Sequence, residues 1–103
     1  MREYIDTAGR SPFTKWLRAI NVQAAAKVAT ALERVAAGNL SNVKTVGGGI
    51  LESRVDFGPG YRIYFGRDGD RPVILLAGGT KKRQQEDIRQ AIGHWDDYKK
   101  RKA

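Results

Sequence analysis

The sequence predicts a single α+β domain over residues 1–103, in which a helical hairpin packs on an antiparallel sheet of about four strands. Three runs of strand-forming residues, Ile50–Phe57, Tyr61–Phe65 and Val73–Ala77, are separated by loops rich in Gly, Pro and Asp. This spacing is typical of an antiparallel meander. Two amphipathic helical patterns precede the meander and a third follows it. The chain is long enough to bury one modest hydrophobic core.

The first elements are a short strand and two helices. Arg2–Thr7 is a candidate strand that joins the sheet. Ser11 and Pro12 supply a hydroxyl cap and a proline at the first helical position, and an apolar stripe follows them. Asn21 caps a second helix, Val22–Ala37, whose many alanines allow close approach to a neighbour. We expect these two helices to form a hairpin that covers the apolar face of the sheet.

The segment between the second helix and the meander, Asn39–Gly49, is expected to be a loop that ends in three consecutive glycines. These glycines are either a flexible entry to the next strand or a loop that passes close to a ligand backbone. After the meander, Gln84–Lys99 forms the third helix and a basic tail closes the chain. Trp16 and Trp95 lie on the apolar stripes of their helices and are expected in the core.

Alternation along the strands predicts which side chains share a face of the sheet. A three-residue loop, Gly58-Pro59-Gly60, places Phe57 opposite Tyr61 on an apolar face. The other face is charged, and its members are Asp56 opposite Arg62, Arg54 opposite Tyr64, and Glu52 further along. A two-residue loop would scatter charge onto the apolar face.

The third strand of the meander, Val73–Ala77, shows no alternation and is expected to be central and covered on both sides. It leads directly into Lys81, Lys82 and Arg83, so three cations are delivered to the end of a strand. The sheet is therefore expected to offer one apolar face for packing and one cationic face for chemistry.

The chain is strongly basic, with 19 Lys and Arg against 11 Asp and Glu and a formal net charge of +8. This charge favours a polyanionic partner or an acidic protein over a merely soluble basic surface. No apolar run approaches the roughly 20 residues of a membrane span, and the N-terminus lacks the apolar segment of a secretory signal. Cysteine is absent, so the sequence predicts a cytoplasmic protein without membrane partners.

Several kinds of site are excluded by residue type and spacing. With no Cys and one His, the sequence predicts no metal site and no cofactor. Neither glycine-rich stretch has the spacing of a phosphate-cradling loop followed by a helix. His94 lies off the apolar stripe of the last helix, which indicates a surface or flanking histidine, and no Ser-His-Asp arrangement is suggested.

A cationic face without a metal suits RNA cleavage, because RNA carries its own nucleophile in the 2′-OH. Fixed cations stabilise the charge that develops at phosphorus. Arg62 is the first candidate for the phosphate, since a guanidinium contacts two oxygens at once, and Arg54 is the second. Lys81 either holds the phosphate or takes the 2′-OH proton.

Two further candidates lie on the same face. Tyr64 either stacks on a base or donates a proton. Glu52 is either a general base or a simple partner of Arg54. The competing interpretation of the face is structural: Asp56 and Arg62 would form an ordinary cross-strand ion pair worth well under about 1 kcal/mol.

The residues that carry a family resemblance are Leu51-Glu52-Ser53-Arg54, the segment from Gly58 to Phe65, and Leu75 to Lys81 followed by Gln85, Asp87-Ile88 and Ala91. In their order and spacing they resemble the HigB-like branch of the RelE/ParE toxin superfamily, the phage-derived Gp49-like or addiction-module killer proteins. The similarity runs over about residues 2–97. Asn21 departs from the pattern, because an Asp is expected between the first two helices. That difference concerns helix capping rather than chemistry.

The resemblance implies a RelE-like fold and the toxin of a type II toxin–antitoxin system, usually a ribosome-dependent mRNA endoribonuclease that inhibits translation and arrests growth. It implies as partners the ribosome, mRNA and a cognate antitoxin, either acidic or of the helix-turn-helix DNA-binding class. Arg62 matches the sheet arginine used at the scissile phosphate, and Lys81 lies in the basic segment after the following strand. The cations assigned to RNA or ribosome binding are Lys44, Lys82, Arg83, Lys99, Lys100 and Arg101.

Two other functions remain open at this stage. A ParE-like protein-binding inhibitor of DNA gyrase would have the same fold. A non-catalytic nucleic-acid-binding module would bind with a steep salt dependence and leave the strand intact. The general acid and base, the codon preference, the antitoxin and the oligomeric state are not assigned by the sequence.

Overall fold

The computed structural model describes residues 2–69 and 71–102. The elements, in chain order, are β1 (Arg2–Glu3), α1 (Pro12–Ala19), α2 (Val22–Ala36), β2 (Val43–Gly47), β3 (Ile50–Val55), β4 (Tyr61–Asp68), β5 (Arg71–Thr80), a 3₁₀ turn (Lys81–Arg83) and α3 (Gln84–Lys102). The α+β class and the order of helices and strands predicted from the sequence are confirmed.

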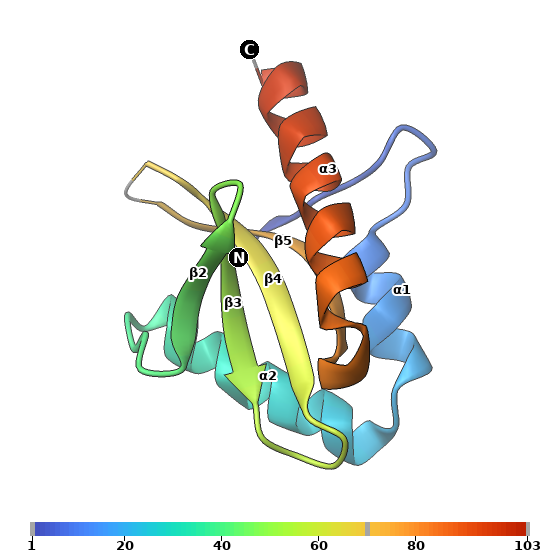
Figure 1. Cartoon of the computed structure of the whole chain (residues 1–103), viewed down its shortest axis with the longest axis vertical. Coiled ribbons are helices and arrows are strands. Elements are labelled where there is room, and N and C mark those ends of the chain that lie inside the picture. Colours follow the sequence, from blue (N-terminus) through green and yellow to red (C-terminus); the bar gives the residue numbers. More distant parts are fainter. Residues whose placement is uncertain (1, 70, 103) are drawn as a thin grey trace.

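The strands form one five-stranded sheet in the order β1-β5-β4-β3-β2. Among the described strands β1 and β5 pair in parallel, and the other neighbours are antiparallel. In Figure 1, α2 lies behind the sheet and α3 crosses in front of it. The β5 strand lies between β1 and β4 with Ile74, Leu75 and Leu76 buried, which confirms that the unalternating strand is interior. The arrangement is consistent with a RelE-like fold.

Both helix starts are confirmed by their caps. The Ser11 Oγ accepts a hydrogen bond of 3.1 Å from the Thr14 backbone N–H, and Pro12 occupies the first helical position. The Asn21 Oδ1 accepts one of 2.7 Å from the Ala24 N–H. Each side chain satisfies a backbone donor that has no partner inside its helix, and this fixes where α1 and α2 begin.

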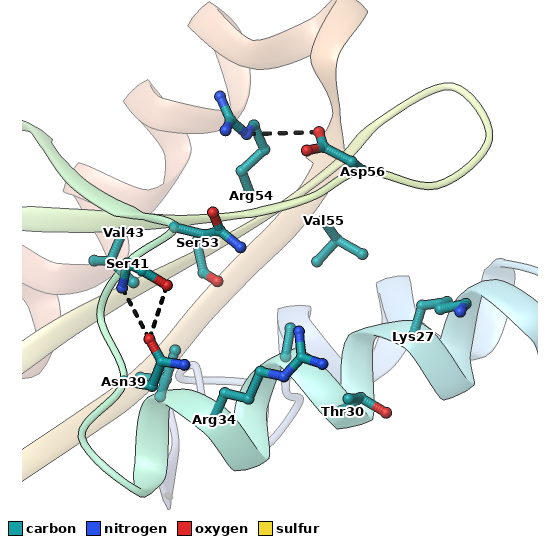
Figure 2. A pocket seen from close by; sticks show the side chains of 13 residues that line it. Lys27, Thr30, Arg34, Asn39, Ser41, Val43, Ser53, Arg54, Val55 and Asp56 are labelled. Carbon is teal, nitrogen blue, oxygen red and sulfur yellow. Dashed lines mark hydrogen bonds and ion pairs between the residues drawn. The ribbon is translucent and has the colours of Figure 1, made fainter.

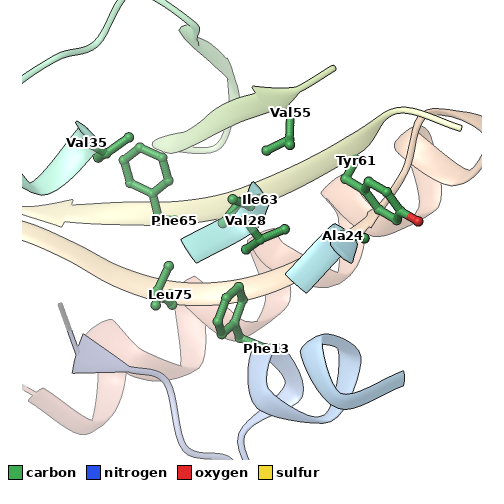
Figure 3. Close-up of a cluster of buried hydrophobic side chains, with 9 residues drawn as sticks. All are labelled: Phe13, Ala24, Val28, Val35, Val55, Tyr61, Ile63, Phe65 and Leu75. Carbon is green, nitrogen blue, oxygen red and sulfur yellow. The ribbon is translucent and has the colours of Figure 1, made fainter. Parts of the chain in front are cut away.

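Two separate hydrophobic cores hold the layers together. The first lies between the sheet and the helical hairpin (Figure 3), and its buried members are Phe13, Ala24, Val28, Val35, Val55, Tyr61, Ile63, Phe65 and Leu75. The second lies between the sheet and α3, and its buried members are Tyr4, Ile50, Tyr64, Ile74, Leu76, Ala77, Ala91 and Trp95. Trp95 is buried and Trp16 packs against the first core, as predicted. The face expected to be cationic is therefore apolar over the part that belongs to the second core.

The segment expected to be a loop, Asn39–Gly49, is not a loop throughout. Val43–Gly47 forms the edge strand β2, because Val43 packs on the first core and Val46 on the second. The last residue of β2, Gly47, and the two glycines after it have positive φ values and turn the chain into β3. A Cβ at Gly48 would lie 2.8 Å from the Ile92 Cγ1, so this turn packs tightly against α3. The close neighbour of these glycines within the chain is thus a helix side chain.

The predicted register between β3 and β4 is wrong by two residues. Tyr61 pairs with Val55 instead of Phe57, because β3 ends at Val55 and residues 56–60 form a five-residue loop. The loop is closed by a 3.0 Å hydrogen bond from the Gly60 N–H to the Phe57 carbonyl. A shift of two keeps every side chain on its predicted face. It changes the partners: Arg54 is opposite Arg62, and Glu52 is opposite Tyr64.

The last four basic residues are not a tail, because α3 continues to Lys102. The Arg101 guanidinium pairs with Asp97 at 2.7 Å, donates to the Ile5 carbonyl and lies 5.2 Å from the centre of the Tyr4 ring. The Tyr4 hydroxyl donates to the same Asp97 carboxylate at 2.6 Å. This cluster ties the end of α3 to the segment after β1. No helix among the described residues is long and apolar enough to cross a membrane.

Candidate functional site

Charged side chains gather at one end of the sheet, where β3 ends, β4 begins and β5 leads into the 3₁₀ turn. Arg62 on β4 lies between Arg54 on β3 and Gly79 on β5. The Lys81 backbone N–H donates to the Gly60 carbonyl at 2.9 Å, and this bond holds the basic segment against the loop before β4. Arg54, Arg62 and Lys81, which the sequence predicted to converge, are thus brought together.

Two hollows open at this place, and Arg54 and Arg62 line both. The loop-side hollow, of about 370 Å³, is also lined by Lys81 and by residues 56–60. The strand-side hollow, of about 150 Å³, is also lined by Lys44, Glu52 and residues 41–43. Of these two arginines, Arg62 is the buried one, at 7% exposure. A ligand in either hollow would therefore meet the same fixed guanidinium.

One hydrogen bond and one ion pair within the protein hold the Arg62 guanidinium, while its buried Nε makes no hydrogen bond. Nη1 donates to the Tyr61 carbonyl at 3.2 Å, and Nε lies 3.6 Å from the Glu52 Oε1. Nη2 forms no hydrogen bond with the described residues, and the Arg62 side chain lines both hollows. A guanidinium fixed in this way loses little further entropy when it binds a phosphate oxygen.

Glu52 is 1% exposed and stands behind Arg62. Its carboxylate accepts a 2.7 Å hydrogen bond from the Gln84 Nε2 and lies 3.7 Å from the Lys44 Nζ. The ion pairs predicted as the structural alternative, Glu52 with Arg54 and Asp56 with Arg62, are wrong. Glu52 pairs with Arg62, and Arg54 pairs with Asp56 at 3.5 Å. Gln84 is a site residue that sequence reasoning missed. The available signal was its position directly after the basic segment.

Tyr64 lies beside Glu52 but is completely buried. Burial raises the pKa of its hydroxyl, and the negative charge of Glu52 raises this pKa further. Tyr64 is therefore a neutral phenol at physiological pH. Its ring presents no surface on which an RNA base could stack, which contradicts that part of its predicted role.

Asp87 on α3 is a second buried carboxyl that sequence reasoning did not place in the site. Burial raises its pKa, although the nearby Arg83 guanidinium opposes this shift. A Cβ at Gly79 would lie 1.8 Å from the Asp87 Oδ2, so the carboxyl rests directly on the backbone of β5. Gly79 pairs with Arg62 across the sheet, which places Asp87 over the same part of the site.

The remaining predicted cations divide between the two ends of the molecule. Lys82 and Arg83 are exposed in the 3₁₀ turn, next to Lys81, and Arg83 lies 3.5 Å from Glu86. Lys99, Lys100 and Arg101 are at the other end of α3, a helix of 19 residues that is about 28 Å long. In Figure 1 that end of α3 lies far from the loop between β3 and β4. The structure does not bring these three residues to Arg62.

The described residues contain no group of three or more His, Asp or Glu side chains arranged as metal ligands would be. His94 is half-buried and stacks on the Tyr4 ring at a centroid distance of 4.9 Å. Burial lowers its pKa. It stacks on a member of the second core and lines neither of the two hollows, which agrees with the interpretation of His94 as a flanking residue.

The family described as phage-derived protein Gp49-like (DUF891) matches residues 15–96 of this chain. The chain belongs to the Gp49-like family. This membership supports the resemblance noted above, because Gp49-like proteins are the addiction-module killer, RelE-like branch and are associated with toxin–antitoxin systems. An uncharacterized protein of Haemophilus influenzae (strain ATCC 51907 / DSM 11121 / KW20 / Rd) is 42% identical over 80 residues, which cover 77% of this chain and 81% of that protein. The matched Gp49-like segment contains Glu52, Arg62 and Lys81.

Proposed function

We propose that this Gp49-like protein is the toxin of a type II toxin–antitoxin system and that it acts as a ribosome-dependent mRNA endoribonuclease. The observation that carries the proposal is the buried guanidinium of Arg62, which donates to the Tyr61 carbonyl, pairs with Glu52 and lines two cationic hollows. A fixed cation that faces a hollow suits a phosphate whose charge increases during the reaction.

The proposed reaction uses the RNA 2′-OH as the nucleophile. The 2′-oxygen forms a bond to the adjacent phosphorus, and the bond from phosphorus to the 5′-oxygen breaks. The products are a 2′,3′-cyclic phosphate and a 5′-OH. One proton leaves the 2′-OH and one is delivered to the 5′-oxygen. The five-coordinate phosphorus carries extra negative charge, and one well-placed donor is worth roughly 3 kcal/mol of barrier in other enzymes.

Three cations share the work at the phosphate. Arg62 contacts the non-bridging oxygens through Nη2, and Arg54 supports it from the opposite strand. Lys81 is exposed at the rim of the loop-side hollow, where it is either a further cation or the group that accepts the 2′-OH proton. Its backbone is fixed by the hydrogen bond to Gly60, so its side chain starts from a defined place.

Glu52 acts as a positioning residue in this proposal rather than as the general base. Its carboxylate is enclosed and already has Arg62, Lys44 and Gln84 as partners. A base must reach the proton that it removes. The second carboxyl, Asp87, is also buried against the backbone and is assigned no proton transfer.

The exposed cations Lys82, Arg83 and Lys44 border this site and are proposed to contact ribosomal RNA or the mRNA backbone. Lys99 and Lys100, at the far end of α3, would do so only on a separate surface. A cognate antitoxin, acidic or of the helix-turn-helix class, is the proposed protein partner. The site of action is the ribosome in the cytoplasm.

The deciding experiment combines purified protein with ribosomes and a defined mRNA, and maps cleavage by primer extension. In parallel, the same protein is added to a gyrase supercoiling reaction. We expect the wild-type protein to cut mRNA and Arg62→Ala to leave it intact, while Arg89→Gln, an exposed cation on α3, cuts as the wild type does. Uncut mRNA together with blocked supercoiling would reject the nuclease in favour of a gyrase inhibitor.

A further inference from the structure

A third hollow lies on the opposite face of the sheet from the Arg62 guanidinium. This helix-side hollow, of about 310 Å³, is enclosed by α2, the α2–β2 connection and the end of β3 (Figure 2). Arg34 and Lys27 line it from α2, and Ser53 lines it from β3. Figure 2 shows Ser53 directed toward α2 and Arg54 directed to the other side of the strand. The hollow thus opens mainly on the other face of the sheet from the Arg62 side chain.

The helix-side hollow carries positive charge that the described part of the chain does not neutralise. Neither Lys27 nor Arg34 forms an ion pair with a carboxylate among residues 2–69 and 71–102. The only carboxylate among its lining residues, Asp56, is turned toward Arg54 at 3.5 Å. Hydroxyl and amide side chains line part of the wall, beside Ala31 and three valines, and give an anion hydrogen-bond donors as well as charge.

This hollow is continuous with the site at Arg62. It shares Ser41, Asn42, Val43 and Arg54 with the strand-side hollow. Arg54 lines all three hollows, and its backbone N–H donates to the Asn42 carbonyl at 3.1 Å. An extended ligand can therefore pass over residues 41–43 from one face of the sheet to the other without leaving a polar, cationic path.

We propose that the helix-side hollow binds the backbone phosphates of the single-stranded RNA that flanks the cleavage point. The inference deepens the proposed nuclease function and rests on it. Arg34 and Lys27 are seven residues apart on α2, which is about 10 Å along the helix axis. That separation suits successive phosphates of one strand better than a single carboxylate. The continuous path from this hollow to Arg62 also favours RNA over an acidic protein segment, because one RNA strand places phosphates at both positions.

The test measures binding apart from cleavage. Fluorescent single-stranded RNAs of three and nine nucleotides, made uncleavable by 2′-O-methyl groups, are titrated against wild type, Arg34→Gln, Lys27→Gln and the double variant. Arg89→Gln removes one exposed cation elsewhere and is the matched control. All these positions are on exposed helix surfaces, and Gln is a good helix former, so the variants are expected to fold. Circular dichroism checks this.

We expect the nine-nucleotide RNA to bind the wild type more tightly than the three-nucleotide RNA. The double variant should lose about tenfold or more of the affinity for the long RNA and little for the short one. Its plot of log affinity against log salt should be shallower by roughly 0.7 for each lost phosphate contact. Equal losses in the double variant and in Arg89→Gln would overturn the proposal, because the charge effect would then be general.

An acidic peptide distinguishes an acidic protein partner from RNA as the ligand of this hollow. If the double variant binds long RNA normally but loses binding to a poly-glutamate peptide, the hollow is an interface for an acidic protein and the RNA proposal is wrong. Failure of the nuclease gives a different pattern. A wild-type protein that binds long RNA through Arg34 and Lys27 but cuts no mRNA on ribosomes would reject the nuclease and support the hollow as an RNA site.

Discussion

Arg54 and Arg62 occupy directly opposite positions on β3 and β4. Like charges in such a pair are destabilising. Here each arginine has its own carboxylate: Asp56 lies 3.5 Å from the Arg54 Nε, and Glu52 lies 3.6 Å from the Arg62 Nε. The carboxylates flank the pair instead of separating it. The end of the sheet therefore keeps two guanidinium groups close together, an arrangement that a phosphate between them would stabilise.

The first prediction concerns the shape of the Arg62 side chain. Arg62→Lys keeps the positive charge but loses the planar fork and the anchors on the Tyr61 carbonyl and Glu52. We expect mRNA cleavage on ribosomes to fall by about 10²-fold or more, close to the effect of losing a transition-state donor. Arg54→Lys should cost less, because Arg54 is exposed. Wild-type cleavage by Arg62→Lys would show that charge alone suffices.

The second prediction separates positioning from base catalysis at Glu52. Glu52→Gln keeps the size of the side chain and removes the charge that orients Arg62. We expect a lower rate of cleavage with an unchanged shape of the pH–rate profile. Loss of the limb of the profile that reports a carboxylate base would instead identify Glu52 as the base.

Stability distinguishes the two Glu52 variants. Glu52→Ala leaves the buried Arg62 without its countercharge and should lower the free energy of unfolding by about 3 kcal/mol, measured by urea denaturation. Glu52→Gln should cost less, because an amide oxygen can still accept the hydrogen bond from Gln84. Equal losses in the two variants would mean that the lost charge accounts for the whole cost and that the hydrogen bond from Gln84 adds nothing.

The parts of the fold that follow from local chemistry could be predicted from the sequence. Ser11 and Asn21 indicate where the helices start, and the two-residue period assigns Arg54 and Arg62 to one face for either a three-residue or a five-residue loop. The register could not be predicted, because the five-residue loop depends on how Phe57 and Gly60 close it in three dimensions. A wrong loop length moves every cross-strand partner.

The part of the site that could not be predicted from the sequence depends on contacts between distant segments. Gln84 and Asp87 are polar residues at the start of a helix, and nothing near them in the sequence identifies Glu52 or Gly79 as their neighbours. The burial of Tyr64 follows from the position of α3 over the sheet, which a sequence period does not reveal. Alternation gave the correct face, but the covering helix decided which side chains on it remain accessible.

The third prediction follows from the raised pKa of Asp87. The folded protein binds this proton more tightly than the unfolded chain, in which the pKa is about 3.9. The stabilisation that the protonated Asp87 carboxyl gives the folded state is therefore lost as the pH rises through its folded-state pKa. We expect the difference in unfolding free energy between wild type and Asp87→Asn to change in the wild type's favour on acidification toward pH 4.

Urea denaturation at several pH values measures this difference. Glu3 and Asp97 have lowered pKa values and lose their stabilising effect as the pH falls, but they are present in both proteins and cancel. A difference that does not change on acidification toward pH 4 would contradict the raised pKa of Asp87.

The last prediction uses two glycines that differ in their surroundings. A Cβ at Gly78 on β5 would lie 2.1 Å from the Trp16 ring, whereas a Cβ at Gly93 on α3 meets nothing within 4 Å. Gly78→Ala should lower the free energy of unfolding by about 2 kcal/mol or more through overpacking. Gly93→Ala should raise it by about 1 kcal/mol, because alanine favours the helix. Thermal unfolding should show shifts of opposite sign, at about 4–8 °C per kcal/mol.

The Gly78→Ala variant also tests how α1 packs on the sheet. If the cost of Gly78→Ala arises at Trp16, then adding Trp16→Leu should recover part of it, with a coupling of about 0.5–3 kcal/mol between the two changes. Trp16 also contacts Phe13 and Tyr61, so Trp16→Leu alone is destabilising and the coupling must be taken from the complete cycle. Strictly additive effects would mean that the ring moves away freely, and the hairpin would then not be locked to β5 by this contact.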